Sequence, residues 1–574
     1  GLAGGTAPDA REPASAATRM RDAPRPKRHV GLLSPARTTA RRAMVAELHA
    51  ALGRGDLTGA AGLNARLAGE AVHRAFRVLD AWQEVRDPAT GLIPRSTDPR
   101  MAYWAPEDNG ADAFAFFLVA SLQRDEDAGR LWGRVLDTER DLCGPMPCVI
   151  TLPAGRPAPR PLPATIFGAS EYAKDGLLAL TERFGAGPWF ARLEEIAREI
   201  IRVAPVRTRA GPIPSGDAEV NGNVLQVLTR LYWATRNPTY VQAAERIADA
   251  YFLEVLPRTG YAPVKAWDFA AGRPESSLVR VRDHGSEIVS GLAELYLLER
   301  WLDRDAAARY RQPLQRLLER LLGSPRTGDG LWHNAFDFRT GRIVDGALVD
   351  TWGYLLNAYA TVDRADGVST HAAEIRRVMS AAASRRSYPW EGEEQDGYAD
   401  ALESMLYLLP WYDVSGAGPW LDDEMEVLLS KQFPSGFVEE WYLDGNFVRT
   451  ALLYAGYKTQ GIVPRPWRAD VRVGAARDRR GSVLHVHLEA ERAWTGALRF
   501  DPPRHRTIWR MPRDYPRLNA TPEWYPVASE RTYEVVEVET GRRSRVPGQV
   551  LLDGLPVDLT RGRTLRLRIV PPPG

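Results

Sequence analysis

The feature that most constrains this chain is a repeated alternation of amphipathic helices and short polar loops between residues 64 and 460. Apolar residues recur at spacings of three, four and seven, for example at Leu193, Ile196 and Ile200. Such spacing places one apolar stripe on each helix, and that stripe has to be buried. The pattern therefore predicts a mainly α protein built from packed pairs of helices.

The helices follow one another without an exact sequence repeat. Because no fixed period of about 34–40 residues appears, an (α/α) toroid is favoured over a solenoid. The toroid is expected to have six pairs, with seven as the alternative. We place the fourteen helices at residues 64–86, 110–123, 126–140, 169–184, 188–203, 218–235, 238–254, 284–303, 305–322, 347–362, 367–384, 397–410, 418–431 and 446–460.

The periodicity changes from 3.6 to 2 after the segment VPRPW at 463–467. Leu484, Val486 and Leu488 then alternate with more polar neighbours, and Pro, Gly and Asp mark turns. This alternation predicts a C-terminal antiparallel β-sandwich. The expected organisation is a poorly ordered segment at 1–30, a toroid at 31–463 and the β-sandwich at 464–574.

Charge and cysteine content exclude several classes of function. The chain has 75 basic and 73 acidic residues, a formal charge of +2, which gives no argument for nucleic acid or an anionic membrane as partner. Cys143 and Cys148 are the only cysteines. They fit either a small disulfide loop or two free thiols, and without nearby histidines they do not make a zinc site. We expect no cofactor and no metal, and a secreted or periplasmic location; the oligomeric state is left open.

Polar residues gather at the predicted helix starts, which converge at one end of a toroid. Among the carboxylates we expect Asp350 and Glu287 to carry acid/base chemistry, followed by Asp217 and Glu219. The residues expected to bind substrate are Trp104, Asp108, Tyr172, Lys174, Asn221, His284, His333, Trp352, Trp390, Glu440, Trp441 and Arg449. Of these, Lys174, Asn221, His284 and Arg449 would orient a sugar carboxylate, and the tryptophans would stack on sugar rings.

This set of residue types suits two reactions on carbohydrates. Paired carboxylates serve glycoside hydrolysis, in which one donates a proton and the other acts as base or nucleophile. Histidine, tyrosine and asparagine would instead serve β-elimination from a uronic acid. No P-loop, dinucleotide fingerprint, nucleophile elbow or His-Glu-x-x-His motif is present in the sequence.

Several segments resemble bacterial six-hairpin carbohydrate-active proteins. They are FGASEYAKDGLLALTE, NGNVLQVLTRLYWAT, RDHGSEIVSGLAELYLLERW, VDTWGYLLNAY and EEWYLDGNFVRTALLYAGYKTQG. The chain is similar over residues 64–570 to the β-glucuronidase-type glycoside hydrolase family 154, and more distantly to unsaturated glucuronyl hydrolases. The resemblance implies an (α/α)6 toroid, exo-action on a glucuronic acid residue and no metal chemistry.

Three hypotheses follow from the sequence. The first is a glycoside hydrolase that removes a terminal uronic acid, a β-glucuronide, from a glycan. The second is a polysaccharide lyase on the same scaffold, in which His284, Tyr172 and Asn221 matter most. The third is a glycan-binding protein without catalysis, against which the density of carboxylates argues.

Overall fold

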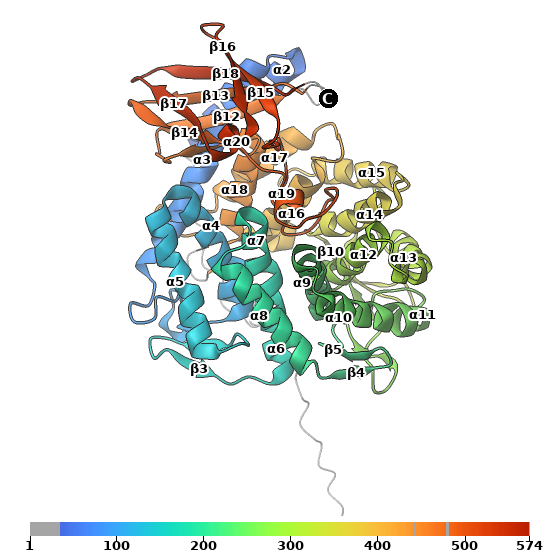
Figure 1. Ribbon diagram of the computed structural model, residues 1–574. Coiled ribbons are helices and arrows are strands. Elements are labelled where there is room, and N and C mark those ends of the chain that lie inside the picture. The colour runs from blue at the N-terminus through green and yellow to red at the C-terminus, as the bar shows by residue number, and fades with distance from the viewer. Residues whose placement is uncertain (1–34, 440–442, 478–481, 573–574) are drawn as a thin grey trace, which may run out of the picture.

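The computed structural model describes residues 35–439, 443–477 and 482–572. Helices form a ring, and the C-terminal strands lie at one end of it (Figure 1). The short hairpins near residues 156 and 210 lie at the other end. The predicted poorly ordered segment at 1–30 lies outside the described residues.

Seven helical segments form the inner ring in the part of the chain that the structure describes. Each packs against the next, and the last packs against the first, so the ring closes. They are η2–α4 (Pro106–Phe114 and Ala115–Arg124), α6–η3–α7 (Leu162–Glu171, Tyr172–Leu177 and Leu178–Phe184), α9 (Ala218–Thr235), η5–α12 (Val281–Gly285 and Ser286–Trp301), α14 (Trp352–Asp366), α16 (Gln395–Leu408) and α18 (Asn446–Thr459).

An outer helix precedes each inner segment. These helices are α3 (Leu57–Glu84), α5 (Glu126–Cys143), α8 (Pro188–Val203), α10 (Pro238–Asp249, continued by η4, Ala250–Val255, and α11, Leu256–Arg258), α13 (Ala306–Leu322), α15 (Ala372–Ala383) and α17 (Ala417–Leu429). The described chain therefore has seven helix pairs. This is the alternative that the sequence left open, and it is one pair more than the resemblance implies. None of its helices is both long and apolar enough to cross a bilayer.

All fourteen predicted helices are present, with ends that differ by a few residues. The structure adds α2 (Pro35–Arg54), which periodicity did not predict. Its buried apolar stripe is short, limited to Val45, Leu48 and Ala51. Polar and small residues occupy most of the helix, so the sequence pattern there is weak.

Each inner segment carries a glycine, at its start in six of the seven segments and within η3 in the segment α6–η3–α7. These glycines are Gly110, Gly176, Gly222, Gly285, Gly353, Gly397 and Gly445. A Cβ on Gly222 would overlap main-chain atoms of Glu287 on the neighbouring inner helix. At the closure of the ring, Gly445 donates its N–H to the carbonyl of Asp112 at 2.7 Å, and a Cβ on Gly445 would overlap that carbonyl.

Two antiparallel sheets make up most of the C-terminal part, which confirms the predicted antiparallel strands there; the β-sandwich stays a prediction. One has the order β12-β13-β18-β15-β16 and the other β11-β14-β17. The strands are β11 (Val463–Arg465), β12 (Val471–Arg477), β13 (Leu484–Ala490), β14 (Trp494–Arg499), β15 (Thr532–Glu537), β16 (Arg543–Pro547), β17 (Leu555–Leu559) and β18 (Thr564–Val570). Buried side chains from both sheets form one hydrophobic cluster.

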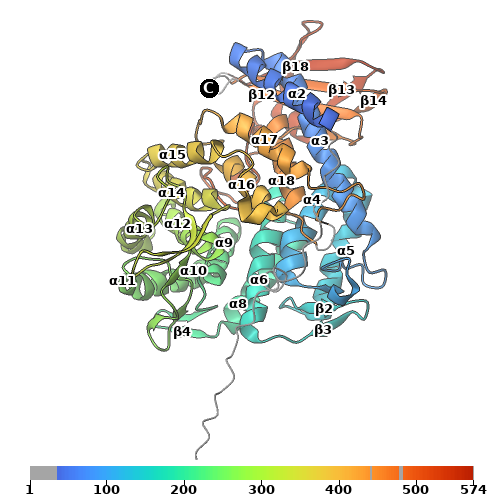
Figure 2. The ribbon, with the colours of Figure 1, turned by 180° about the vertical axis from the view of Figure 1, so that it is seen from behind.

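The first outer helix joins the ring to the larger sheet. The N-terminal half of α3 packs on β12 and β13, as the reverse view shows (Figure 2). Asn64 on α3 donates a hydrogen bond to the carbonyl of Ala475 at 2.8 Å. Segment 501–525 returns to the helices, where Trp509, Met511, Tyr515 and Trp524 belong to the helical core. The ring and the sheets therefore share buried contacts at two places.

Short strands cover the N-terminal ends of several inner segments. The strands β1 (Tyr103–Trp104), β2 (Val149–Thr151) and β3 (Arg156–Ala158) form one antiparallel sheet. The strands β8 (Leu278–Arg280), β9 (His333–Asp337) and β10 (Ile343–Leu348) form another. Two hairpins, β4 (Val206–Thr208) with β5 (Gly211–Ile213) and β6 (Trp267–Asp268) with β7 (Arg273–Pro274), complete the set.

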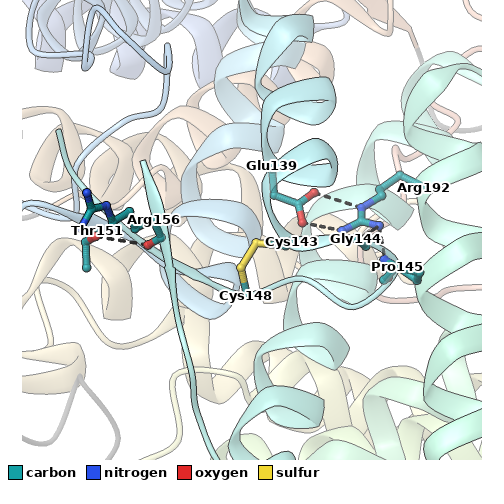
Figure 3. Close-up of a disulfide and its surroundings, with 8 residues drawn as sticks. All are labelled: Glu139, Cys143, Gly144, Pro145, Cys148, Thr151, Arg156 and Arg192. Atoms are coloured by element: carbon teal, nitrogen blue, oxygen red, sulfur yellow. Dashed lines mark hydrogen bonds and ion pairs between the residues drawn. A yellow bond between two sulfur atoms is a disulfide. The ribbon is translucent and has the colours of Figure 1, made fainter. Parts of the chain in front are cut away.

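Cys143 and Cys148 form a disulfide, one of the two states that the sequence left open. It closes the loop between α5 and β2 (Figure 3). Arg192 from α8 donates to the carbonyls of Gly144 and Pro145 in this loop, at 2.9 and 3.1 Å. The same guanidinium pairs with the buried carboxylate of Glu139. The loop is therefore fixed both covalently and by one arginine.

We expect Gly222→Ala to destabilise the protein by at least about 2 kcal/mol, because the added methyl group would push two inner helices apart. Gly133→Ala is the matched control, since Gly133 lies in a helix and a Cβ there meets nothing within 4 Å. We expect that control to stabilise by up to about 1 kcal/mol through helix propensity. Urea unfolding monitored by circular dichroism measures both. Equal effects of the two substitutions would contradict the close approach at Gly222.

Candidate active site

Acidic residues from the seven inner segments gather at one end of the ring, six sets from the segment starts and one set, with Asp175, from η3. Asp112 shows this most clearly, since its carboxyl group experiences the charges of Asp444, Asp396 and Asp175 from three other segments. Burial, reinforced by these negative charges, raises the pKa of Asp112 well above its usual value. Helix N-termini carry partial positive charge, which offsets some of the repulsion.

Lys174, Arg282 and Arg449 are cations enclosed within this acidic cluster, and each is already paired. Lys174 Nζ lies 2.8 Å from Asp175 Oδ1 and 2.7 Å from Glu287 Oε1. Arg282 lies 3.2 Å from Asp350 Oδ1 and 2.6 Å from Glu391 Oε1. The third, Arg449, has its Nη2 2.6 Å from an Asp400 oxygen and 3.1 Å from a Glu403 oxygen. The cluster therefore holds a surplus of carboxylates even after its ion pairs are formed.

Asp217, Glu219 and His284 form a centre within the cluster. Asp217 caps α9, accepting the N–H of Glu219 at 2.8 Å. His284 Nε2 lies 3.3 Å from one oxygen of Asp217 and 3.3 Å from one oxygen of Glu219. The side chain of Asp217 is 30% exposed and that of Glu219 is 16% exposed, so neither is fully enclosed by the protein.

The two carboxylates of this centre differ in proton affinity. Burial raises the pKa of Glu219 to about 7, although the positive charge of His284 opposes the change. Burial acts on Asp217 as well, but its hydrogen bond and charge interaction with His284 hold the pKa of Asp217 below its usual value. For His284 itself, the carboxylates of Glu219 and Asp217 outweigh the effect of burial and raise the imidazole pKa.

The same three residues could hold a divalent cation. One ligand atom from each lies within 4.8 Å of the others, and imidazole with two carboxylates is a usual ligand set for transition metals. A second group of this kind, His505, Asp514 and Glu523, lies in the segment that returns from the sheets. In the first group, the hydrogen bond and charges that His284 shares with the carboxylates give it a role without a metal.

The expectation that Asp350 and Glu287 lead the acid/base chemistry stays a prediction, and the structure places both residues in enclosed surroundings. Asp350 is only 1% exposed and lies against Arg282. Glu287 is 4% exposed and is held by Lys174 and by Gln226, whose amide donates at 2.6 Å. Burial raises the pKa of Asp350 to about 6 and also raises that of Glu287. Both carboxylates are therefore paired with cations and are more enclosed than Asp217 and Glu219.

The expected aromatic platforms are part of the core. Trp104, Tyr172, Trp352 and Trp390 are all 0% exposed. Trp104 packs edge-on against Tyr172, with ring centroids 5.7 Å apart. These four rings cannot stack on a sugar, because other side chains already cover them. Glu440 and Trp441 were also expected to bind substrate, and they lie outside the described residues.

Three other predicted binding residues have structural contacts. Asp108 pairs with Arg95 at 3.1 Å and is buried. Asn221 is fully buried, and its amide donates to the carbonyls of Ser215 and Asp217 at 2.7 and 3.0 Å. This amide braces the turn that presents Asp217, so Asn221 positions the centre and does not bind substrate. His333 lies on β9 with Nδ1 2.8 Å from the carbonyl oxygen of Gly346.

Arg282 and Asp283 are not among the residues that the sequence analysis selected. Asp283 has φ of +58°, a left-handed conformation that is uncommon for aspartate, and its side chain is 31% exposed. The strained residue lies next to His284, in a π-helical turn. Two further π-helical segments, η2 and η3, also lie at this end of the ring, where such turns often mark functional sites.

Asn519 reaches the cluster from the C-terminal part of the chain. Its amide donates to Asp175 Oδ1 at 2.9 Å and to the carbonyl of Lys174 at 3.2 Å. Asn519 lies 344 residues from Asp175 in sequence, so no local pattern could have paired them. A polar residue followed by glycine occurs in six of the seven inner segments and is the sequence signal that could have located the other members; in the seventh, the residue before Gly353 is Trp352.

We expect Glu219→Gln to lower the pKa of His284, because the Glu219 carboxylate is the largest charge that raises it. The imidazole resonances of histidine-labelled protein, followed against pH by NMR, measure this pKa. Glu523→Gln is the matched control, since Glu523 contacts a different histidine, His505, at 2.9 Å. A His284 pKa that is unchanged by Glu219→Gln would rule out the centre as described.

Comparisons with known proteins give no family for this chain. No protein-family model matches it, and no curated protein matches it in sequence.

Some solved structures are similar to this chain. One is the α-1,6-mannanase GH76A from Salegentibacter sp. HEL1_6, which has 10% sequence identity and a TM-score of 0.39. The alignment covers 67% of this chain and 99% of that chain. An unsaturated glucuronyl hydrolase specific for heparin has 12% identity, coverages of 68% and 96%, and a TM-score of 0.38. Cellobiose 2-epimerase from Spirochaeta thermophila DSM 6192 has 13% identity, coverages of 69% and 99%, and a TM-score of 0.37. At these values the likeness assigns neither family nor activity, and similarity to glycoside hydrolase family 154 stays a prediction.

Proposed function

We propose that this protein is a glycoside hydrolase whose acid/base centre is Asp217, Glu219 and His284. The observation that carries the proposal is the pair of accessible carboxylates that share one imidazole and have pKa values displaced in opposite directions. Environments that separate two carboxyl pKa values in this way assign one group as acid and the other as base.

In this mechanism Glu219 is the proton donor. Its pKa of about 7 keeps a substantial fraction protonated near neutral pH, so it can protonate the glycosidic oxygen as the bond breaks. Asp217 remains ionised beside His284 and acts as the base or nucleophile. The nearby carboxylates, among them Asp283 and Asp396, stabilise the positive charge that develops on the sugar ring in the transition state.

The ion pairs of the cluster affect which charge a sugar substrate can carry. The expectation of a glucuronide rested on Arg449 and Lys174 as partners for a sugar carboxylate. Both cations are neutralised by two carboxylates each, and a uronate would enter a site with surplus negative charge. We therefore propose an uncharged or amino sugar at this centre, and we keep the β-glucuronide as the tested alternative.

A panel of 4-nitrophenyl glycosides, including the β-glucuronide, tests the proposal. We expect Glu219→Gln and Asp217→Asn each to lower kcat at least about 100-fold on the best substrate. Asparagine caps a helix as well as aspartate does, so Asp217→Asn should fold normally. Glu523→Gln, far from the centre in sequence and contacts, is expected to keep full activity. Full activity of Glu219→Gln would contradict the assignment of the donor.

The pH dependence gives a second check. Activity is expected to fall as pH rises through about 7, because Glu219 then loses the proton that it donates. At acidic pH activity is expected to fall only well below the usual aspartate range, because the pKa of Asp217 is lowered. Initial rates on the best glycoside across the pH range measure both limits. A rate that stays constant through neutral and alkaline pH would exclude Glu219 as donor.

A polysaccharide lyase is the second candidate. The observation that favours it is the contact between His284 and Asp217, since a carboxylate-oriented imidazole is a usual general base. Elimination also needs a cation or amide to neutralise the uronate, and the paired state of Lys174, Arg282 and Arg449 weighs against this. Ultraviolet absorbance from the new double bond, measured on uronate polymers, separates the two reactions.

We also propose that the chain functions in an oxidising compartment. The Cys143–Cys148 disulfide supports this, because disulfides persist mainly in secreted and periplasmic proteins. Mass measurement of thiol-labelled protein from native cells, before and after reduction, would test it.

A further inference from the structure

Arginine side chains gather at the opposite end of the ring from the acidic centre, where the inner helices end. Arg236 directly follows α9, and Arg364 lies in the last turn of α14. The returning segment, residues 501–525, adds Arg510 and Arg513, and both are exposed. A helix C-terminus carries only about half an elementary negative charge, so it stabilises a nearby cation without neutralising it. We call these four residues the arginine surface.

Contacts between the helices and the returning segment join the arginine surface. Arg236 Nη2 donates a hydrogen bond to the carbonyl of Arg510 at 3.1 Å. Burial lowers the pKa of Arg236, and the positive charge of Arg510 adds to this effect. Burial also lowers the pKa of Arg364, where the charge of Arg513 adds to the effect and Asp514 opposes it. Each arginine of the returning segment therefore lies close to an arginine from the end of an inner helix.

Two tryptophan rings support the arginine surface from below. The Arg236 guanidinium lies 4.7 Å from the centroid of the Trp233 ring, and that of Arg513 lies 4.8 Å from the centroid of the Trp301 ring. The two tryptophans pack against each other with centroids 6.5 Å apart. A guanidinium on a ring face keeps N–H donors free at its edges. The rings therefore hold these donors in place for a ligand.

Carboxylates near the arginine surface are bound to other cations. Asp514 pairs with Arg517, and Asp366 pairs with Arg300 at 3.2 Å. No member of the arginine surface forms an ion pair in the part of the chain that the structure describes. The surface therefore keeps positive charge that no carboxylate of the protein contacts.

The local backbone does not explain the presence of two of these arginines. The angle φ is +59° at Arg236 and +57° at Arg510, a left-handed conformation that favours glycine and asparagine. Arginine is therefore not the residue that either position favours on conformational grounds, and the two positions are in contact.

We propose that the arginine surface binds an acidic polysaccharide. Carboxylate or sulfate groups of the polymer would accept hydrogen bonds from the guanidinium groups, whose planar donors match two oxygens at once. A polymer fits because the charges come from two inner helices and the returning segment and lie on an outer face. Nucleic acid fits less well, because guanidinium groups already cover the tryptophan faces on which bases would stack. The surface lies at the other end of the ring from the acidic centre, so binding does not require the proposed hydrolase activity.

Isothermal titration calorimetry of the intact protein with polygalacturonate tests the proposal. The same polymer with its carboxylates methyl-esterified is the control ligand, because it keeps the backbone and lacks the charge. We expect polygalacturonate to bind, with an affinity that falls as ionic strength rises, and the ester not to bind. A single-stranded oligothymidylate of equal charge is expected to bind more weakly. Tighter binding of the oligonucleotide, or equal binding of the ester, would overturn the proposal.

Arg236→Asn combined with Arg510→Asn removes two charges and suits the left-handed backbone. We expect this double variant to unfold at the temperature of the parent or above it, and to bind polygalacturonate at least about 10-fold more weakly. Arg561→Asn combined with Arg563→Asn is the matched control, because both arginines are exposed in the turn before β18. The control makes the same change in net charge and is expected to bind as the parent does.

Glu219→Gln separates the arginine surface from the acidic centre, and it is expected to bind polygalacturonate with unchanged affinity. A loss of binding in Glu219→Gln would place the polymer in the acidic centre and overturn the proposal. Unchanged binding by the Arg236 and Arg510 double variant, or an equal loss in the two double variants, would overturn it as well.

Discussion

The close contact of the inner helices at their first turns is the constraint on which the rest of the structure depends. Seven segments surround one axis. At Gly222 and Gly445, main-chain atoms of the neighbouring segment lie where a Cβ atom would be placed. This geometry brings first-turn residues from every segment within electrostatic range of one another. Aspartate and glutamate are favourable at helix N-termini. Closing the ring therefore also concentrates negative charge at one end of it.

Concentrated charge in turn explains the buried cations. Carboxylates that repel one another in a poorly hydrated space either bind protons or acquire partners. Lys174, Arg282 and Arg449 provide partners for six of them, while Glu219 and Asp112 have raised pKa values. Asp217 and Glu219 are among the partly exposed carboxylates and have pKa values shifted in opposite directions, which is why the proposed acid/base chemistry is assigned to them.

Sequence reasoning recovered the helices because each amphipathic stripe is local, as for α8 and α9, whose predicted ends match the structure. It also selected Asp217, Glu219 and His284, since capping and spacing mark helix starts. It could not rank them against Asp350 and Glu287, because burial depends on neighbouring segments. The tryptophans were misassigned for the same reason. The sequence pattern around an aromatic residue at a helix start is the same whether the ring faces a ligand or the core.

Asn519 has a consequence for what counts as the functional unit of this protein. Its amide enters the acidic cluster from beyond residue 464, and the segment that carries it adds Trp509 and Tyr515 to the helical core. A polypeptide cut at the end of the ring would lose a hydrogen-bond donor to Asp175 and expose buried aromatic surface. The returning segment therefore belongs to the packing around the acidic cluster, and its removal would change the surroundings of Asp175 as well as the helical core.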